Sequence, residues 1–196
     1  MALRRVLICG EPELRKKSRK IKNIDGALVE LLDDMVETML DAPGVGLAAP
    51  QVGENLRAIV LAEYEEGEEP RVHACINPRI VETEGEIEGG EGCLSLPTLH
   101  AVVLRPERVV VEGLDRDGEA IEMEAHGLMA RAFCHEIDHL NGKLFIDRAL
   151  ADSIAWMIPD EDDDRGYHLH YISKADAEET LRRVVEKRLA EAERDG

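Results

Sequence analysis

Residues 134–140 read Cys-His-Glu-Ile-Asp-His-Leu and contain two histidines, His135 and His139, four positions apart. On an α-helix this spacing places both imidazoles on one face, about 40° apart, where they can share a metal ion. Glu136 follows the first histidine, so it can reach a water on that metal without being a ligand. This is the H-E-x-x-H arrangement of metal hydrolases, which supplies two nitrogen ligands and a general base. The stretch therefore predicts a metal-binding helix.

The residues around the histidines support a helix with a face in the core. Apolar side chains recur at three- and four-residue spacings before a C-terminal stop at Asn141-Gly142; they are Leu128, Met129, Ala132, Phe133, Ile137 and Leu140. The alternative is a surface helix that carries two histidines by chance. Histidines beside a buried surface need polar partners, and one metal ion satisfies both. The apolar pattern therefore favours the metal site.

A catalytic metal site usually has three protein ligands and one open position. The metzincin pattern would supply a third histidine, but Phe145 stands at that place. Downstream carboxylates are available at Glu161, Glu178 and Glu179, in an acidic loop and a polar helix. Upstream, Cys93 lies among several glycines, which would let the backbone hold a thiolate close to a ligand. A lone cysteine is more often a packed side chain, but beside the histidine helix Cys93 is the favoured third ligand.

Residues 44–49 match the dinucleotide-binding pattern G-x-G-x-x-A, but their context contradicts that function. Such a motif should follow a strand and open a helix. Here residues 28–40 repeat their apolar side chains at helical spacing after Asp25, a suitable N-cap, and Pro50 would interrupt a following helix. The segment instead indicates a tight loop that ends in Gln51, a neutral hydrogen-bond donor.

Three segments together closely resemble the motifs of the peptide deformylase family. They are residues 44–51, Gly-Val-Gly-Leu-Ala-Ala-Pro-Gln; residues 91–95, Glu-Gly-Cys-Leu-Ser; and residues 135–139, His-Glu-Ile-Asp-His. Their order and separations are also similar to those of the family, and the resemblance extends from about Val6 to Asp147. Cys134 stands where many members have glutamine, and it is expected to be a packed side chain.

The resemblance implies a metal-dependent hydrolase that removes the N-formyl group from the initiator methionine of nascent polypeptides and releases formate. The implied metal ligands are Cys93, His135 and His139, with Glu136 as general base and then general acid. The Gln51 amide and the Leu94 backbone N–H would stabilise the oxyanion. The implied ion is Fe²⁺, and the donor set also suits Zn²⁺, Ni²⁺ or Co²⁺.

The resemblance also assigns residues that bind the substrate and support the helix. Val45 and Leu128 would belong to the methionine pocket, and Gly46 and Glu91 would lie along the peptide backbone. Asp138 would point away from the metal and pair with Arg105.

Two rival functions use the same helix. A zinc aminopeptidase or endopeptidase would take a downstream carboxylate in place of Cys93. A structural zinc site would need a fourth protein ligand, which the sequence does not offer. It would also leave Glu136 without a catalytic role.

Composition and patterning predict one domain over residues 1–196, with a core at 1–147 and an acidic loop and C-terminal helix at 148–196. The chain is 44% hydrophobic but only 3% aromatic, so its core should be mainly aliphatic. Residues 57–62, 72–77, 79–84, 101–104, 108–113 and 120–124 are predicted strands. Strands without intervening helices indicate an α+β fold, with antiparallel sheets packed around the central metal-binding helix and helices near both ends of the chain.

Charge and cysteine usage bear on partners and compartment. The acidic stretches at 63–69, 82–91 and 159–165 are expected to be solvated loops, and a net charge of −18 weighs against direct nucleic-acid binding. No stretch is apolar enough to span a membrane, and unpaired cysteines without an export signal indicate the cytoplasm. Arginines and lysines cluster on the predicted helix at 175–194. They could dock weakly on the ribosome, but interspersed glutamates favour an ordinary solvated helix.

Overall fold

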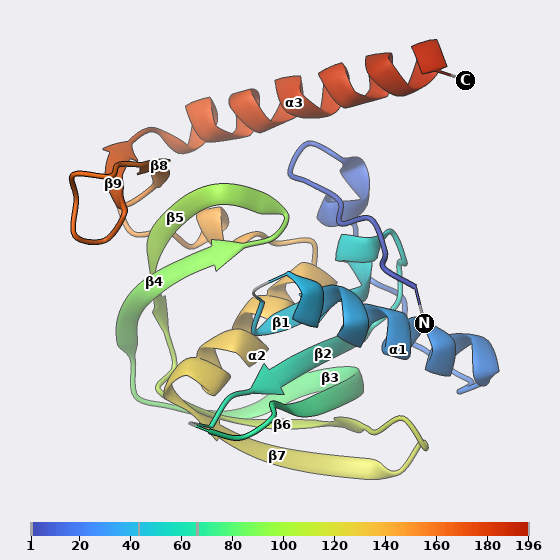
Figure 1. Ribbon diagram of the computed structural model, residues 1–196. Helices are drawn as coiled ribbons and strands as arrows, with labels where there is room; N and C mark the ends of the chain where they lie inside the picture. Colours follow the sequence, from blue (N-terminus) through green and yellow to red (C-terminus); the bar gives the residue numbers. More distant parts are fainter. Residues whose placement is uncertain (1, 43, 66, 196) are drawn as a thin grey trace.

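The computed structural model describes residues 2–42, 44–65 and 67–195. Two antiparallel sheets enclose a central helix, so the predicted α+β class is confirmed (Figure 1). The five-stranded sheet has the order β1-β2-β3-β6-β7. Its strands are β1 (Gly46–Ala48), β2 (Ala58–Glu63), β3 (Arg71–Glu84), β6 (Arg108–Leu114) and β7 (Ala120–His126). The four-stranded sheet has the order β4-β5-β8-β9; its strands are β4 (Ile87–Cys93), β5 (Leu96–Arg105), β8 (Ala155–Pro159) and β9 (Tyr167–Tyr171).

The five-stranded sheet is covered on both faces by helices. Along β2, Ile59 and Leu61 pack in the cluster that includes α2 (Gly127–Leu140), while Ala58, Val60 and Ala62 pack against α1 (Gly26–Asp41). Successive side chains of a strand point to opposite faces, so burial on both faces explains why β2 is a continuous apolar run. The predicted helix after Asp25 is confirmed as α1, and the Asp25 side chain accepts a 3.0 Å hydrogen bond from the Leu28 N–H.

Helix α2 is buried along most of its length because it lies between the two sheets (Figure 1). Every residue from Ala130 to Leu140 is buried, including five with polar or charged side chains: Arg131, His135, Glu136, Asp138 and His139. Such groups are rarely buried unless they are paired or bind a ligand. Their concentration on one helix marks the functional centre of the fold.

Two of the predicted strands are a single strand in the structure. Residues 72–77 and 79–84 form the single long strand β3, with a register shift between Ile76 and Arg79. Asn77 has a positive φ of 55°, and Pro78 lacks an N–H, so the ladder breaks there without ending the strand. The expected acidic loop at 82–91 is also wrong, because these residues complete β3 and form most of β4.

The chain after residue 153 is more structured than the predicted acidic loop and helix. Residues 155–171 form the β8–β9 hairpin, and acidic residues 160–164 lie at its turn. The predicted C-terminal helix is confirmed as α3 (Lys174–Asp195), which buries Ala177, Leu181 and Val185. Among the described residues, three short 3₁₀ helices complete the fold: η1 (Pro12–Arg15), η2 (Ala49–Val52) and η3 (Phe145–Asp147). Within the described residues, no helix is long and apolar enough to cross a membrane.

Candidate metal centre

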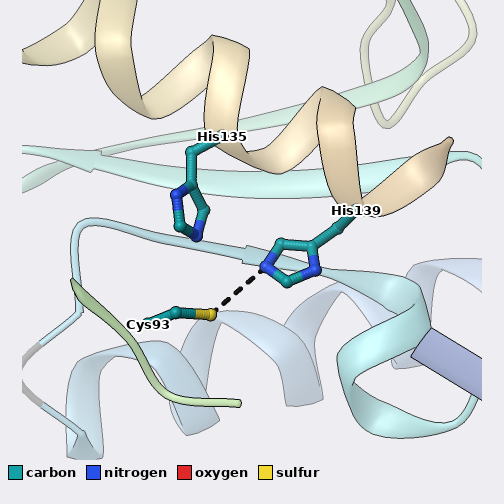
Figure 2. Close-up of side chains that lie close together, drawn as sticks. All are labelled: Cys93, His135 and His139. Atoms are coloured by element: carbon teal, nitrogen blue, oxygen red, sulfur yellow. Dashed lines mark hydrogen bonds between the residues drawn. The ribbon is translucent and has the colours of Figure 1, made fainter. Parts of the chain in front are cut away.

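The structure brings the three predicted metal ligands together. The ligand atoms of Cys93, His135 and His139 all lie within 4.8 Å of one another. Figure 2 shows both imidazoles reaching down from α2 toward the cysteine, with Cys93 Sγ 3.2 Å from His139 Nε2. The two histidines are buried and Cys93 is half-buried. The fold therefore brings Cys93 close to two histidines that lie more than 40 positions later in the sequence.

Cys93 is positioned by the end of strand β4. It closes β4 and pairs with Leu96 of β5 after a register shift that follows Glu91. The neighbouring glycines make room for side chains. A Cβ on Gly89 would lie 2.6 Å from Arg131 Nη2, and one on Gly90 would collide with His100 Nε2. The glycines therefore let two large side chains pack against β4.

The polar atoms around the centre fit a bound cation. His135 Nδ1 lies 2.9 Å from Glu91 Oε2, which leaves Nε2 of this ring for a ligand. Among the described residues, Glu136 Oε2 and His139 Nδ1 are buried without a hydrogen-bond partner. An unpartnered buried carboxylate is costly unless a ligand or water satisfies it. One thiolate with two imidazoles is a donor set for zinc, iron, nickel or cobalt.

Glu91 and Glu136 have opposite environments, although both carboxylates are buried. Burial raises the pKa of Glu136 to about 7. Burial also acts to raise the pKa of Glu91, but hydrogen bonds from His135 and Arg105 overcome it and lower this pKa to about 2. Glu91 is therefore fixed as an anion, whereas Glu136 is suited to exchanging a proton near neutrality.

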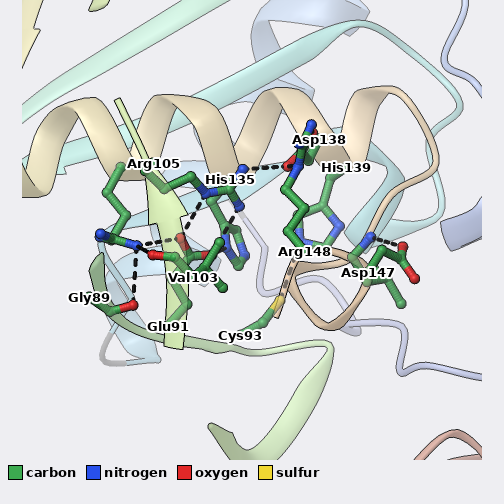
Figure 3. Close-up of polar contacts among 12 residues, drawn as sticks. Gly89, Glu91, Cys93, Val103, Arg105, His135, Asp138, His139, Asp147 and Arg148 are labelled. Atoms are coloured by element: carbon green, nitrogen blue, oxygen red, sulfur yellow. Dashed lines mark hydrogen bonds and ion pairs between the residues drawn. The ribbon is translucent and has the colours of Figure 1, made fainter. Parts of the chain in front are cut away.

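A buried ion-pair network supports the histidine helix (Figure 3). Arg105 donates two hydrogen bonds to Glu91, at 2.8 and 3.0 Å, and a third to Asp138 at 2.5 Å. The predicted pair of Arg105 and Asp138 is therefore confirmed. Arg148 donates to both oxygens of the same aspartate, at 2.5 and 2.7 Å. These contacts tie β5 and the segment after α2 to the outer side of the helix.

Arg131 and Arg148 are functional-site neighbours that sequence reasoning missed. Arg131 donates to Glu91 at 2.9 Å and to the carbonyl oxygens of Ile87, Gly89 and Val103. A signal for Arg131 was present: it lies one helical turn before His135, on a stretch that is otherwise apolar. Arg148 lies in a segment without a regular pattern, so nothing in the sequence indicated its partner.

The remaining predicted site residues line one cavity of about 550 Å³ beside the cluster. Gln51 is buried, and its Nε2 lies 3.4 Å from Cys93 Sγ and 3.2 Å from Ser95 Oγ. The walls also include Val45, Gly46, Glu91, Leu94, Leu128 and Glu136. His139 lies outside this lining. A larger open cavity of about 830 Å³ lies between α1 and the β6–β7 turn, away from these side chains.

Two of the residues that line the cavity are placed differently from what their expected substrate-binding roles suggest. Leu128 is 64% exposed, so it forms the rim of the cavity and leaves the interior to other side chains. The Glu91 side chain is occupied by its partners Arg105, Arg131 and His135. Its carboxylate thus supports His135 and is already occupied by protein partners.

Replacing Arg105 with alanine would leave two buried carboxylates, Glu91 and Asp138, short of a partner. We expect Arg105→Ala to lower the free energy of unfolding by about 3–5 kcal/mol, because breaking a buried ion pair leaves an uncompensated charge. Urea denaturation measures this loss. Arg79→Ala is the control: its side chain is 70% exposed and pairs with Glu112, so its effect should stay below about 1 kcal/mol. Equal losses in the two variants would contradict the role given to the network.

Comparison with known proteins agrees with this geometry. Among similar proteins, the peptide deformylase of Syntrophobacter fumaroxidans is 51% identical over 148 residues, which cover 76% of this chain and 87% of that protein. Peptide deformylase 1 of Clostridium acetobutylicum is 52% identical over 153 residues, 78% of this chain and 98% of that protein.

Solved structures give the same result. The crystal structure of a peptide deformylase from Legionella pneumophila is similar with a TM-score of 0.72 and 43% identity, covering 76% of this chain and 88% of that one. The peptide deformylase from Thermus thermophilus has a TM-score of 0.71 and 45% identity, covering 76% of this chain and 86% of that one. The family model described as polypeptide deformylase matches residues 3–153, which include all three motif segments. The chain therefore belongs to the peptide deformylase family.

Proposed function

We propose that Cys93, His135 and His139 hold a single divalent metal ion at which this chain carries out its reaction. As a member of its family, the chain removes the N-formyl group from the initiator methionine of nascent polypeptides and releases formate. The observation that carries the proposal is the convergence of three ligand atoms within 4.8 Å beside the unpartnered Glu136 carboxylate. When bound, such an ion activates water and polarises the formyl oxygen. The proposed native ion is Fe²⁺, with Zn²⁺, Ni²⁺ or Co²⁺ able to substitute at the same ligands.

Glu136 is the proposed proton carrier. Its carboxylate is buried, borders the cavity and has one oxygen without a partner. A Cβ on Gly46 would lie 2.5 Å from Glu136 Oε1, so the glycine lets the loop approach this carboxylate. We assign Glu136 the removal of a proton from the attacking water and its delivery to the departing amine.

Gln51 and Leu94 are the proposed donors to the developing oxyanion. The Ala48 N–H donates a 2.8 Å hydrogen bond to Gln51 Oε1, which directs the Gln51 amide nitrogen toward Cys93. Leu94 directly follows Cys93, so its N–H lies next to the thiolate in the chain. Donors that are fixed before the reaction stabilise the transition state without reorganisation.

The substrate is proposed to lie along the cavity walls. Val45 and Leu128 would contact the methionine side chain, and Gly46 and the Glu91 backbone would follow the peptide. We also propose that residues 1–196 form one catalytic domain. Supporting this, Ala177 and Leu181 of α3 pack in the same apolar cluster as Leu99 and Val103 of β5.

The geometry favours Cys93 over the downstream carboxylates that a zinc peptidase would use. Glu178 pairs with Arg15 at 2.7 Å, and Glu179 pairs with Arg182 and Arg183 along α3. Among the described residues, the one cluster with metal-ligand spacing contains only Cys93 and the two histidines.

Cys93→Ser should therefore lose most of the bound metal, because the serine hydroxyl is a much poorer ligand than a thiolate. Elemental analysis of the purified protein measures this loss. Cys134→Ser is the control, since Cys134 is buried beside His135 but has no place in the cluster. Full metal content in Cys93→Ser would instead support a peptidase with a downstream ligand.

Glu136→Gln should keep the metal and lower turnover of formyl-Met-Ala by about 10²–10⁴-fold, because the amide cannot accept the proton. The two measurements are formate release and elemental analysis. Glu30→Gln, an exposed position on α1, should leave both unchanged. Loss of metal from Glu136→Gln would show that this residue is a ligand.

Weak docking on the ribosome through α3 is a further proposal about partners, with the cytoplasm as the proposed compartment. Arg182, Arg183 and Lys187 are each more than half exposed, although glutamates on the same helix pair with them. All four cysteines are free, which suits a reducing compartment.

The double variant Arg183→Ser with Lys187→Ser should co-sediment with ribosomes less than the parent chain at low salt. Both side chains are at least 74% exposed, so hydrolysis of formyl-Met-Ala should be unchanged. Arg71→Ser with Arg79→Ser removes two exposed positive charges from β3 and is the matched control. Equal binding by both double variants would remove the docking proposal.

A further inference from the structure

The β8–β9 hairpin contributes a side chain to the wall of the substrate cavity. Residues 155–171 lie beyond residues 3–153, which match the family model. Nevertheless, Met157 of β8 lines the same cavity as Cys93 and Glu136. We propose that Met157 contacts the residue that follows the formylated methionine and makes the enzyme prefer an apolar side chain there. This inference rests on the proposed function.

The hairpin is fixed in place at the edge of the cavity. Strand β8 pairs with β5 through Leu99 with Trp156 and His100 with Ala155. Trp156 packs against the apolar cluster that contains Leu99, and the Ile172 N–H donates a 2.9 Å hydrogen bond to the Ile154 carbonyl oxygen. Met157 is therefore carried by an ordered strand that is joined to the β5 wall of the site.

The segment of β5 beside Met157 also opens toward the cavity. Pro97, Thr98 and Leu99 all line it, although successive residues of a regular strand face opposite sides. Thr98 has a positive φ of 59°, a backbone conformation that residues other than glycine rarely adopt. Such backbone strain is concentrated at functional sites. The part of the cavity wall formed by these residues therefore contains a strained backbone conformation at Thr98.

The order of the strands indicates which part of the substrate Met157 meets. Cys93 lies on β4, β5 is the next strand, and β8 follows β5. Neighbouring strands are about 4.8 Å apart, so β8 lies roughly 10 Å from β4. This separation is too large for Met157 to meet the formyl group beside Cys93. For a peptide that runs from Cys93 toward β8 and advances about 3.3 Å per residue, the residue after the methionine lies about 7 Å from the formyl group, and its side chain can span the remaining distance to Met157.

The chemistry of this wall favours apolar side chains. Met157 is half-buried and has a flexible, polarisable thioether that adapts to differently shaped partners. The acidic residues of the hairpin lie at its turn, residues 160–164, and are absent from the cavity lining. A small or charged residue after the methionine would leave this apolar surface uncovered or poorly matched.

Steady-state kinetics with formyl-Met-Gly, formyl-Met-Ala, formyl-Met-Leu and formyl-Met-Phe test the inference. We expect kcat/KM of the parent enzyme to be higher for leucine than for glycine at the second position. Met157→Ala should lower this ratio about 3- to 10-fold, mainly by raising KM for the leucine substrate. Met157→Gln, which keeps the side-chain length, should also lower the ratio and provides a second variant if alanine disturbs folding.

Ile158→Ala is the matched control, because Ile158 follows Met157 on β8, is 37% exposed and is absent from the cavity lining. It should leave the ratio unchanged. An unchanged ratio in Met157→Ala or Met157→Gln would overturn the inference, and so would an equal fall in Ile158→Ala. Hydrolysis of all four substrates with equal efficiency by the parent enzyme would also overturn it. Failure of the metal-loaded parent to hydrolyse any of them would instead reject the proposed function.

Discussion

The site depends on one buried carboxylate, Glu91. It receives hydrogen bonds from Arg105 and Arg131 and lies 2.9 Å from His135 Nδ1, so it joins the four-stranded sheet to the central helix. A buried anion is tolerated only when it is paired and hydrogen-bonded, and here every partner belongs to another element. The carboxylate on β4 and the cations that surround it therefore hold the strand against α2. Cys93, two residues further along β4, is brought to the histidines by the same contacts.

The helix that carries the histidines could be predicted from the sequence because its signal is local. The spacing of His135 and His139 places their rings on one face whatever surrounds them, and an apolar repeat marks the buried stretch. The fold class followed from strand patterns in the same way. The pairing of Arg105 with Asp138 was reached through resemblance to a family, and the structure confirms it at 2.5 Å.

Strand β4 could not be predicted in this way, because its residues are explained by contacts with distant parts of the chain and do not form a local strand pattern. Glycines and glutamates are poor strand formers. In the structure, Gly89 and Gly90 leave space for the side chains of Arg131 and His100, and Glu91 pairs with arginines from other elements. The residue type at each of these positions is explained by a partner at least ten positions away in the sequence. The hairpin at residues 155–171 was missed for a related reason, since the acidic turn dominates its composition.

The two buried carboxylates of the site differ in whether their oxygens have hydrogen-bond partners. Hydrogen bonds from His135 and Arg105 outweigh the burial of Glu91 and lower its pKa to about 2, so it remains charged and holds His135 in one orientation. Glu136 has one oxygen without a partner and faces the cavity, and burial raises its pKa to about 7. A group that moves protons must be free to change its charge, while a group that orients a ligand must not. The complete set of partners around Glu91 therefore suits it to orienting His135, and the unpartnered oxygen of Glu136 suits that residue to its proposed role as proton carrier.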